Sequence, residues 1–279
     1  MIQQLSFLFC LFISLQASAG GWLQNEKEGY FKLGQTIIHG NQFYNGEGKQ
    51  TDIITTGVYL TSLYGEYGLS KKFNLIGYIP FLSRSVVNAV RFESGAFQEG
   101  DELTSFGDSD IGIKYGVRQN KSLVISASLV LGLPLGNAEG GESGLLQTGD
   151  GEFNQLVTLS FGYGFNFPLY LNADLGFNNR TKGFSEEIRA AFELGYVWNK
   201  KVIIAAKFST VQSLMNGEPT GSSGNGIFSN NLEYVSFGPE ISYRINEKLG
   251  LTASYFSAAS GRFVLAEPAY GLGIFMELK

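Results

Sequence analysis

Apolar and polar side chains alternate along most of this chain from about residue 29 onward. In Leu123–Leu133 the odd positions are apolar, and serine or glycine stands between several of them. Residues 169–177 and 188–198 repeat the pattern. A period of two is that of a β-strand, whose successive side chains point to opposite faces, whereas the 3.6-residue period of amphipathic helices is nearly absent. The chain is therefore expected to form strands with one apolar and one polar face.

The alternation predicts twelve strands, centred on 29–38, 55–69, 73–88, 108–118, 122–135, 153–165, 168–179, 186–198, 201–212, 231–245, 249–259 and 268–278. Short connections fall at 70–72, 119–121, 166–167, 199–200 and 246–248. Long ones, rich in Gly, Asn, Ser and acidic residues, fall between them at 39–54, 89–107, 136–152, 180–185, 213–230 and 260–267. Barrels of the outer membrane show this alternation of short periplasmic turns and long extracellular loops. We expect an all-β fold, a single transmembrane antiparallel β-barrel of about 12 strands with both termini on the periplasmic side.

A secreted soluble sandwich or barrel is the alternative. Its apolar faces would point inward and its charged residues outward. Here bulky charges of both signs occupy the polar face of most strands, while rings gather at the strand ends. Phe161, Tyr163 and Phe165 precede one short turn, and Tyr196 and Trp198 precede another. Rings in this position are typical of the aromatic girdle at a membrane interface, so the pattern favours the membrane barrel.

Composition excludes several function classes. A net charge of −5 argues against nucleic acid as a partner. One His and one Cys leave little material for zinc or thiol chemistry, and no cofactor is expected. After the N-terminal stretch no apolar run reaches ~20 residues, which argues against a helical membrane protein.

The N-terminal stretch resembles an export signal. Residues 2–15 are apolar but too short to span a bilayer, and Ala17-Ser18-Ala19 is an A-x-A cleavage pattern. We expect residues 1–19 to be a cleaved signal peptide and residues 20–279 to be one barrel domain in a bacterial outer membrane. Cys10 lies within the leader, so the mature chain would contain no cysteine.

The polar face of the strands would line the barrel interior. It carries six cations and six anions: Lys32, Arg84, Lys114, Arg189, Lys207 and Arg244, and Glu66, Asp110, Asp174, Glu193, Glu240 and Glu277. All but Glu277 are taken as candidate channel-lining residues. A pore selective for one ion sign would show a ring of one charge, so the balance suits a narrow path for neutral solutes. It equally suits an ion-pair network that fills the interior, because buried charges must be paired.

Catalysis and metal binding are not expected. His39, at the outer end of the first strand, has no Ser within two residues to act as a nucleophile, and we interpret it as a loop residue. Asp108 and Asp110 lack the further ligands of a calcium loop, and Asp108 is expected to turn the chain into a strand. The remaining loop acids are interpreted as solvated: Glu93, Glu99, Asp101, Glu102, Glu139, Glu142, Asp150 and Glu152. The protein is not expected to be an enzyme.

Several short motifs resemble one family. Phe106–Tyr115, FGDSDIGIKY, resembles the "G-D-hydrophobic-G-x-K/R-Y" strand of outer-membrane transporters named for the meta-cleavage pathways of phenol degradation. Gly132–Gly136, Gly149–Gly151 and Leu171–Phe177 continue the similarity in order, over most of residues 106–260. The resemblance implies an outer-membrane barrel that imports aromatic or other small hydrophobic compounds. Leu135 departs from the Thr that the family often has there, and the chain lacks a terminal aromatic residue.

The sequence therefore predicts a passive outer-membrane channel or transporter for a small, aromatic or hydrophobic solute. The alternative is a non-conducting structural or adhesive barrel, with its lumen closed by ion pairs. Expected partners are the small-molecule solute, outer-membrane lipid and lipopolysaccharide, and the barrel-assembly machinery.

Overall fold

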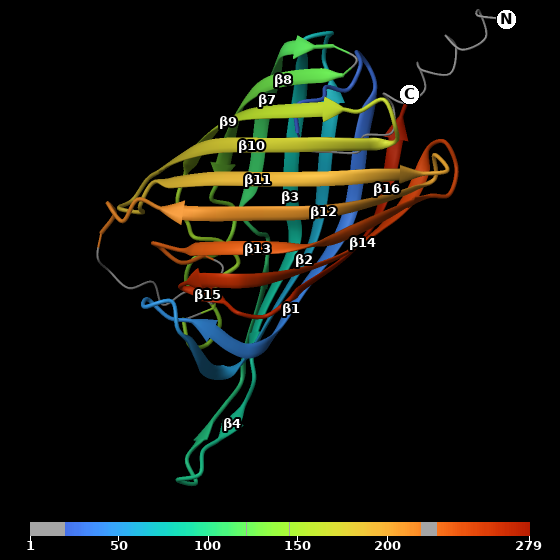
Figure 1. The fold of residues 1–279 in the computed structure, drawn as a ribbon. Helices are drawn as coiled ribbons and strands as arrows, with labels where there is room; N and C mark the ends of the chain where they lie inside the picture. Colours follow the sequence, from blue (N-terminus) through green and yellow to red (C-terminus); the bar gives the residue numbers. More distant parts are fainter. Residues whose placement is uncertain (1–19, 121, 145, 219–227) are drawn as a thin grey trace, which may run out of the picture.

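A computed structural model describes residues 20–120, 122–144, 146–218 and 228–279, so the expected signal peptide lies outside the described residues. Within these ranges fourteen strands form one sheet, and the twelve longest, of 10 to 19 residues, build the wall of a barrel (Figure 1). The wall strands are β1 (Gly29–Tyr44), β2 (Gln50–Gly68), β3 (Phe73–Val87), β7 (Ser109–Gln119), β8 (Leu123–Leu133), β9 (Asn154–Gly164), β10 (Leu169–Arg180), β11 (Glu187–Trp198), β12 (Val202–Ser213), β13 (Glu233–Arg244), β14 (Leu249–Arg262) and β16 (Ala269–Leu278). The short strands are β4 (Val90–Arg91), β5 (Phe97–Gln98), β6 (Asp101–Ser105) and β15 (Val264–Leu265). In the part of the chain that the structure describes, no helix is long and apolar enough to cross a bilayer.

The sheet closes on itself through its first and last strands. Every neighbouring pair in it is antiparallel, and β1 pairs with both β2 and β16. Gly29 lies opposite Tyr67 on one side and Leu278 on the other. The first and last wall strands therefore begin and end at the same end of a closed barrel. The expected twelve-stranded antiparallel barrel is confirmed.

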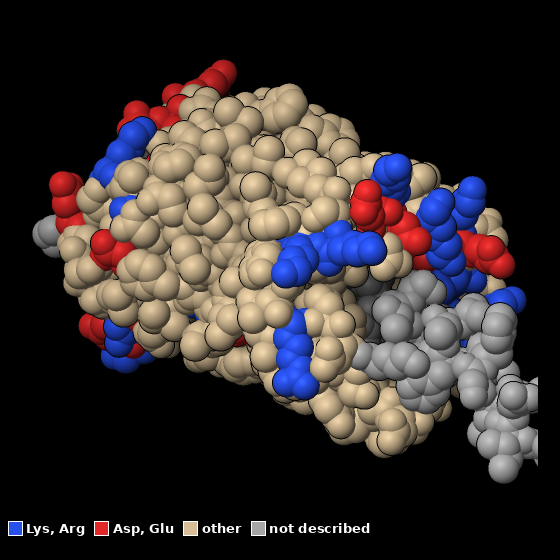
Figure 2. All heavy atoms as spheres, turned by 90° about the horizontal axis from the view of Figure 1, so that it is seen from above, with Lys and Arg blue, Asp and Glu red and all other residues tan. Residues whose placement is uncertain are grey.

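The faces of the barrel are distributed as in a membrane protein. Large apolar side chains point outward and are exposed, with Leu159 at 56% and Leu175 at 59%. Polar side chains point inward, and Asn74 and Asn178 are fully buried. On the face shown in Figure 2, charged side chains gather toward the two ends, with a broad uncharged band between them. An apolar outer band with a polar interior is the arrangement of an outer-membrane barrel.

The short turns at 69–72, 165–168, 199–201 and 245–248 lie at one end of the barrel. In the tightest of them Asn199 and Lys200 have φ values of 48° and 57°. Positive φ at both central positions defines the turn whose twist matches that of a hairpin. The N–H of Lys201 donates to the carbonyl of Trp198 at 3.1 Å and closes the turn.

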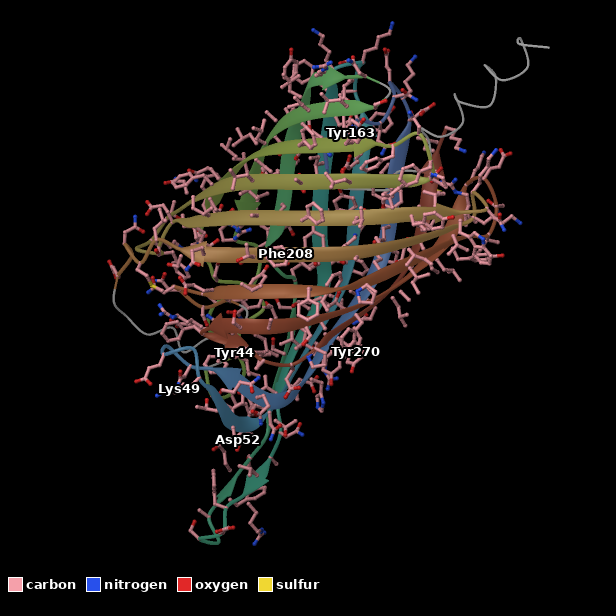
Figure 3. All side chains as sticks on the ribbon, viewed as in Figure 1. Tyr44, Lys49, Asp52, Tyr163, Phe208 and Tyr270 are labelled. Atoms are coloured by element: carbon pink, nitrogen blue, oxygen red, sulfur yellow. The ribbon has the colours of Figure 1, made fainter. Side chains whose placement is uncertain are left out.

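One expected loop is largely strand. We expected 39–54 to be a loop, but β1 continues to Tyr44 and β2 begins at Gln50, so the connection is only 45–49. Lys49 and Asp52 lie together at the end of this long hairpin, far from Tyr163 (Figure 3). His39 is exposed but pairs with Gly57 within the sheet, so its assignment to a loop was wrong. Gly40 and Asn41 are residue types typical of turns, yet both lie within β1, so the sequence pattern did not show the continuing strand.

Two other long connections contain ordered structure. Within the expected loop 89–107, β4 and β5 form a hairpin that projects from the barrel, and β6 pairs with the end of β3 (Figure 1). Within 260–267, β14 continues to Arg262 and β15 pairs with the end of β1. The wall is therefore taller on the side of β1, β2 and β3 than the sequence pattern predicted.

Candidate functional site

The barrel interior is the candidate site. A branched ion-pair network lies on one part of its inner wall. Lys207 lies between Glu193 at 3.2 Å and Glu240 at 2.8 Å. Glu240 also pairs with Lys32 at 3.4 Å, and the Tyr170 hydroxyl donates to Glu193 at 2.6 Å. The network links β10, β11, β12, β13 and β1. Four of the candidate lining residues are thus brought together on the inner face.

A second interior pair lies on β2 and β7. The Lys114 ammonium group donates to both carboxylate oxygens of Glu66 at 3.1 Å. The Tyr64 hydroxyl donates a short hydrogen bond to the same carboxylate. The two charged side chains are only 5% and 2% exposed. A buried pair of this kind tolerates its desolvation because every charge has hydrogen-bond partners.

A third pair lies near the end that carries the short turns. Arg244, the last residue of β13, forms an ion pair with Glu277 of β16. Lys279 lies 3.8 Å from the other oxygen of the same carboxylate. Arg244 is therefore an inward-facing residue, as the alternation predicted.

The opposite end of the interior holds a cluster that the sequence analysis did not find. The Arg180 guanidinium contacts Asp150 at 2.7 Å, Glu152 at 2.8 Å and Glu187 at 2.7 Å. It also lies 4.4 Å from the centre of the Phe184 ring. Glu152 is buried and Asp150 is 14% exposed, so their assignment as solvated loop acids was wrong. No local sequence pattern shows that Arg180 would reach back to acids about 30 residues earlier.

Arg189 extends this cluster into the interior. Its Nε and Nη2 atoms donate to one oxygen of Glu187 at 2.9 and 2.7 Å, while the other oxygen accepts from Arg180. The Arg189 side chain is 41% exposed. Glu187 therefore neutralises part of both cations and holds Arg189 at the edge of the open space.

Asp150 lies in the connection before β9, outside the strands. Burial raises the pKa of its carboxyl group to about 6, although the N–H of Glu152 and the Arg180 cation favour the charged form. The nearby Asp108 carboxylate also raises this pKa. Part of the cluster therefore titrates near neutral pH.

One candidate lining residue faces the other way. Arg84 of β3 is opposite Tyr59, and its guanidinium lies 5.5 Å from the centre of that ring. It is 45% exposed and pairs with Glu102 at 2.6 Å, whereas its neighbours Ser83 and Ser85 are buried. The β3 strand carries one extra residue at a bulge between Ile79 and Leu82. A bulge shifts the alternation by one, so the prediction that Arg84 lines the interior was wrong.

Acidic residues of the long connections hold neighbouring segments together by hydrogen bonds. The Asp108 carboxylate accepts hydrogen bonds from the backbone N–H of Gly136 at 2.9 Å and of Asp150 at 2.7 Å, rather than only turning its own chain. Asp101 accepts from the N–H groups of Glu142 and Ser143 at 3.0 and 2.9 Å. The two carboxylates thus bind described residues of the connection between β8 and β9 and hold them to the rest of the barrel. Among the described residues, no three His, Cys, Asp or Glu side chains are grouped to hold a metal ion.

The segment before β1 lies inside the barrel. The Trp22 ring packs edge-on against the inward-facing Tyr170, with ring centres 6.2 Å apart. A Cβ at position 162 would lie 2.4 Å from the Trp22 ring, so only glycine leaves room for it. Tyr170 and Gly162 belong to β10 and β9, far around the wall from β1.

Backbone contacts fasten the same segment at further points. The Gln119 side chain donates to the carbonyl of Gly21 at 2.8 Å and accepts from the N–H of Leu23 at 3.3 Å. The N–H of Lys27 donates to the carbonyl of Gly68 at 2.8 Å. The segment thus reaches β2, β7, β9 and β10, and it narrows the interior near the short turns.

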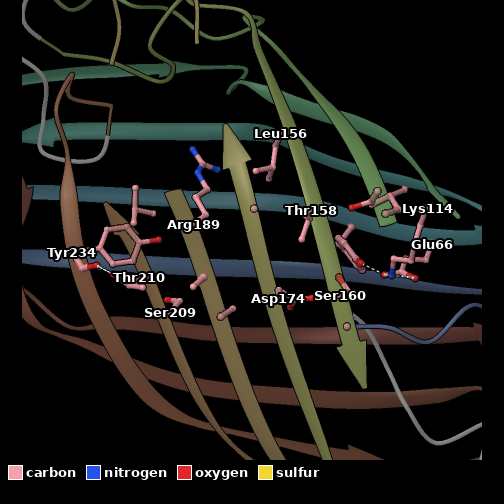
Figure 4. A pocket seen from close by; sticks show the side chains of 18 residues that line it. Glu66, Lys114, Leu156, Thr158, Ser160, Asp174, Arg189, Ser209, Thr210 and Tyr234 are labelled. Carbon is pink, nitrogen blue, oxygen red and sulfur yellow. Dashed lines mark hydrogen bonds and ion pairs between the residues drawn. The ribbon is translucent and has the colours of Figure 1, made fainter. Parts of the chain in front are cut away.

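An open cavity of about 300 Å³ remains within the barrel. In Figure 4, Arg189 and Tyr234 lie on one side of it, Glu66 and Lys114 lie on the other, and Asp174 lies between them. Leu156, Ile76 and Val211 add apolar surface to its lining, while Asp110 and Arg244 are not part of it. The cavity is the place where a small molecule could be held.

Comparison with known families and structures identifies the type of barrel. The family described as "Putative MetA-pathway of phenol degradation" matches residues 35–265. The chain belongs to this family. The resemblance noted over residues 106–260 is therefore confirmed and extends further toward the N-terminus. A comparison with curated proteins found no match.

Solved structures share the fold of this family member at low sequence identity. The COG4313 outer membrane channel from Pseudomonas putida F1 is 12% identical, with a TM-score of 0.67 over 94% of this chain and 99% of that one. The NanC porin is 8% identical, with a TM-score of 0.51 over 88% and 100% of the two chains. The β domain of the Bordetella autotransporter BrkA is 12% identical, with a TM-score of 0.51 over 90% and 99%. The fold of the chain is that of these outer-membrane barrels.

Proposed function

We propose that this family member is a passive outer-membrane channel for a small solute with apolar character. The observation that carries the proposal is the cavity of about 300 Å³ inside a closed barrel, lined by both apolar and polar side chains. A barrel of twelve strands is intermediate in width between barrels of eight strands, which side chains fill, and porins of sixteen strands, which hold an open channel. The family is described by the degradation of phenol, an aromatic compound, and the Pseudomonas putida protein of the same fold is an outer membrane channel, which supports the proposal.

Transport would be diffusion down a concentration gradient through the interior. The paired charges Glu193 with Lys207 and Glu66 with Lys114 form fixed polar walls, so they present few free charges to a passing solute. Apolar side chains of the cavity supply the remaining contact surface. The mechanism needs no cofactor and no covalent step.

The second candidate is a barrel that does not conduct. The Arg180 cluster at one end and the Trp22 segment at the other both narrow the interior, which favours this candidate. Its external loops would then carry the function, as a structural or adhesive protein.

Single-channel recording of the refolded protein in a planar bilayer separates the two candidates. Steady conductance steps that small aromatic compounds block are expected for the channel. A protein that is folded, as shown by heat-modifiable migration on a gel, but never conducts would contradict the channel and support the structural barrel.

The remaining expectations concern export and surroundings. Residues 1–19 would be removed on export, leaving a mature chain that starts at Gly20, and mass spectrometry of the membrane-extracted protein tests this. The outward apolar band would contact outer-membrane lipid and lipopolysaccharide, and insertion would use the barrel-assembly machinery. Depletion of that machinery should leave the protein sensitive to protease in the periplasm.

A further inference from the structure

Asp174 differs from the other inward-facing carboxylates in the middle of the barrel. Glu66, Glu193 and Glu240 each pair with a lysine, whereas Asp174 makes no ion pair within the described part of the chain. It interacts with the Ser160 hydroxyl on the adjacent strand, opposite it in register. Its Oδ1 atom is buried and has no hydrogen-bond partner among the described residues.

An unpartnered carboxylate oxygen in a buried place is unfavourable. Buried polar atoms in proteins nearly always have a hydrogen-bond partner, and those that lack one call for an explanation. Asp174 lies in the wall of the cavity of about 300 Å³ and is only partly buried, although its Oδ1 atom is covered by protein atoms. A molecule within the cavity can therefore approach the carboxylate from the side that faces the cavity (Figure 4). A donor that a solute brings can therefore bind the Asp174 carboxylate.

The rest of the cavity suits a small amphipathic molecule. Leu156, Ile76 and Val211 are aliphatic, and the rings of Tyr64 and Tyr234 also line the space. Ligand pockets are typically 300–1,000 Å³, mostly apolar, with a few placed polar groups. The cavity is at the small end of this range, so its ligand is small.

The neighbouring cations, Lys114 and Arg189, each pair with another carboxylate. Lys114 donates two hydrogen bonds to Glu66, and Arg189 donates two to Glu187. Lys114 also attracts the Asp174 carboxylate, but its ammonium group pairs with Glu66, so Asp174 has no ion-pair partner of its own among the described residues. An anionic head group placed beside it would be repelled, whereas a donor or a cation would be attracted.

We propose that Asp174 is the polar contact for the solute that passes through the barrel. The cavity takes a small molecule with an apolar body and a head that donates a hydrogen bond, such as a hydroxyl or an ammonium group, and it disfavours carboxylates. This inference rests on the proposed channel function and specifies the class of its solute. The head donates to the Asp174 carboxylate, while the body packs against Leu156 and Ile76.

The test uses four probes that share one ring: benzyl alcohol, benzylamine, benzoate and toluene. Each is added to the purified protein in a planar bilayer, and the concentration that halves the single-channel current is measured. Benzyl alcohol and benzylamine are expected to block at concentrations at least about tenfold lower than toluene and benzoate, since a hydrogen bond to a charged group contributes about that much.

Two substitutions separate charge from hydrogen bonding. Asp174→Asn keeps the shape and an acceptor oxygen but removes the charge, so benzylamine should lose about tenfold in blocking strength while benzyl alcohol keeps most of its own. Asp174→Ala removes the acceptor, so benzyl alcohol and benzylamine should both block only as strongly as toluene does. Asp52→Asn, a charge-matched control at the tip of the β1–β2 hairpin, should leave all four values unchanged. Heat-modifiable migration verifies that each variant is folded.

The outcomes distinguish this inference from the channel function. Equal block by all four probes, strongest block by benzoate, or an Asp174→Ala variant that is blocked like the wild type would overturn the assignment of Asp174 while conduction stands. A folded wild-type protein that never conducts would overturn the channel function itself, and with it the inference.

Discussion

Glu152 and Arg180 form a buried ion pair of 2.8 Å that ties the connection before β9 to the last residue of β10. The same carboxylate accepts from the backbone N–H of Thr181 at 2.8 Å through its second oxygen. Asp150 and Glu187 complete the set of acids around the guanidinium. One cation therefore organises this end of the barrel.

Arg180→Met should be strongly destabilising. It leaves three largely buried carboxylates without their shared cation, and breaking a buried pair in this way costs about 3–5 kcal/mol. Urea unfolding followed by fluorescence measures the change. Arg262→Met is the matched control, because its pair with Glu233 is half-exposed and should contribute less than about 1 kcal/mol. Equal effects of the two substitutions would contradict the role given to Arg180.

The stability of this cluster should depend on pH through Asp150. The pKa of Asp150 is about 6 in the folded protein, above its ordinary value of 3.8, so the folded state binds the proton more tightly. The stabilisation of the folded state that this proton binding gives is therefore fully present below about pH 4 and is lost as the pH rises through 6. Urea unfolding between about pH 4 and 7 should show this decline, and Asp150→Asn should reduce the slope. Identical slopes for both proteins would show that the pKa of Asp150 is not raised.

Arg84 should be accessible from outside the barrel and Ser85 should not. The bulge in β3 places the Arg84 side chain outward beside Tyr59, while Ser85 is buried. With Cys10 replaced by Ser, a membrane-impermeant maleimide added to whole cells should label Arg84→Cys and spare Ser85→Cys. The reverse pattern would mean that the alternation continues through β3 without a bulge.

Trp22 should restrict conduction. Its ring fills space against Tyr170 inside the barrel, so Trp22→Ala is expected to raise the single-channel conductance severalfold. Trp198→Ala is the control, because that ring lies on the outer surface with 55% exposed. A Trp22→Ala protein with wild-type conductance would show that the narrowest point lies elsewhere, and the Arg180 end would be the place to look.

The interior should favour cations over anions. Among the described residues six cations face inward, at Lys32, Lys114, Arg180, Arg189, Lys207 and Arg244. Nine acids of the same ranges accompany them, at Glu66, Asp110, Asp150, Glu152, Asp174, Glu187, Glu193, Glu240 and Glu277. The sequence predicted equal numbers of inward-facing cations and acids. The structure instead has an excess of inward-facing acids, partly because Arg84 faces outward.

The reversal potential across a gradient of potassium chloride measures this selectivity. It should correspond to cation preference in the wild type and move toward zero when Asp110 and Asp174 are both changed to Asn. A reversal potential of zero in the wild type would contradict the cation preference and support an interior without net charge.

The strands and turns of this protein follow from local physics that a sequence displays. Side chains of a strand point alternately to two faces, so a run such as Leu169–Phe177 reveals both the strand and its apolar side. Hairpin turns require particular backbone angles, which residues such as Asn199 readily adopt. The twelve wall strands, the closed barrel and the side of the wall that carries the paired charges were therefore predictable.

Only the tertiary structure decided what depends on contacts between distant segments. One extra residue in β3 turned Arg84 outward, and a bulge leaves no reliable mark in the alternation of a single strand. Asp150 and Glu152 looked like solvated loop acids until Arg180, some 30 residues away, was placed against them. Asp174 lacks an ion-pair partner among the described residues because Lys114 donates to Glu66 instead. The periodicity of a chain determines which side of the wall a residue occupies, but the partner that it finds there depends on how the whole barrel closes.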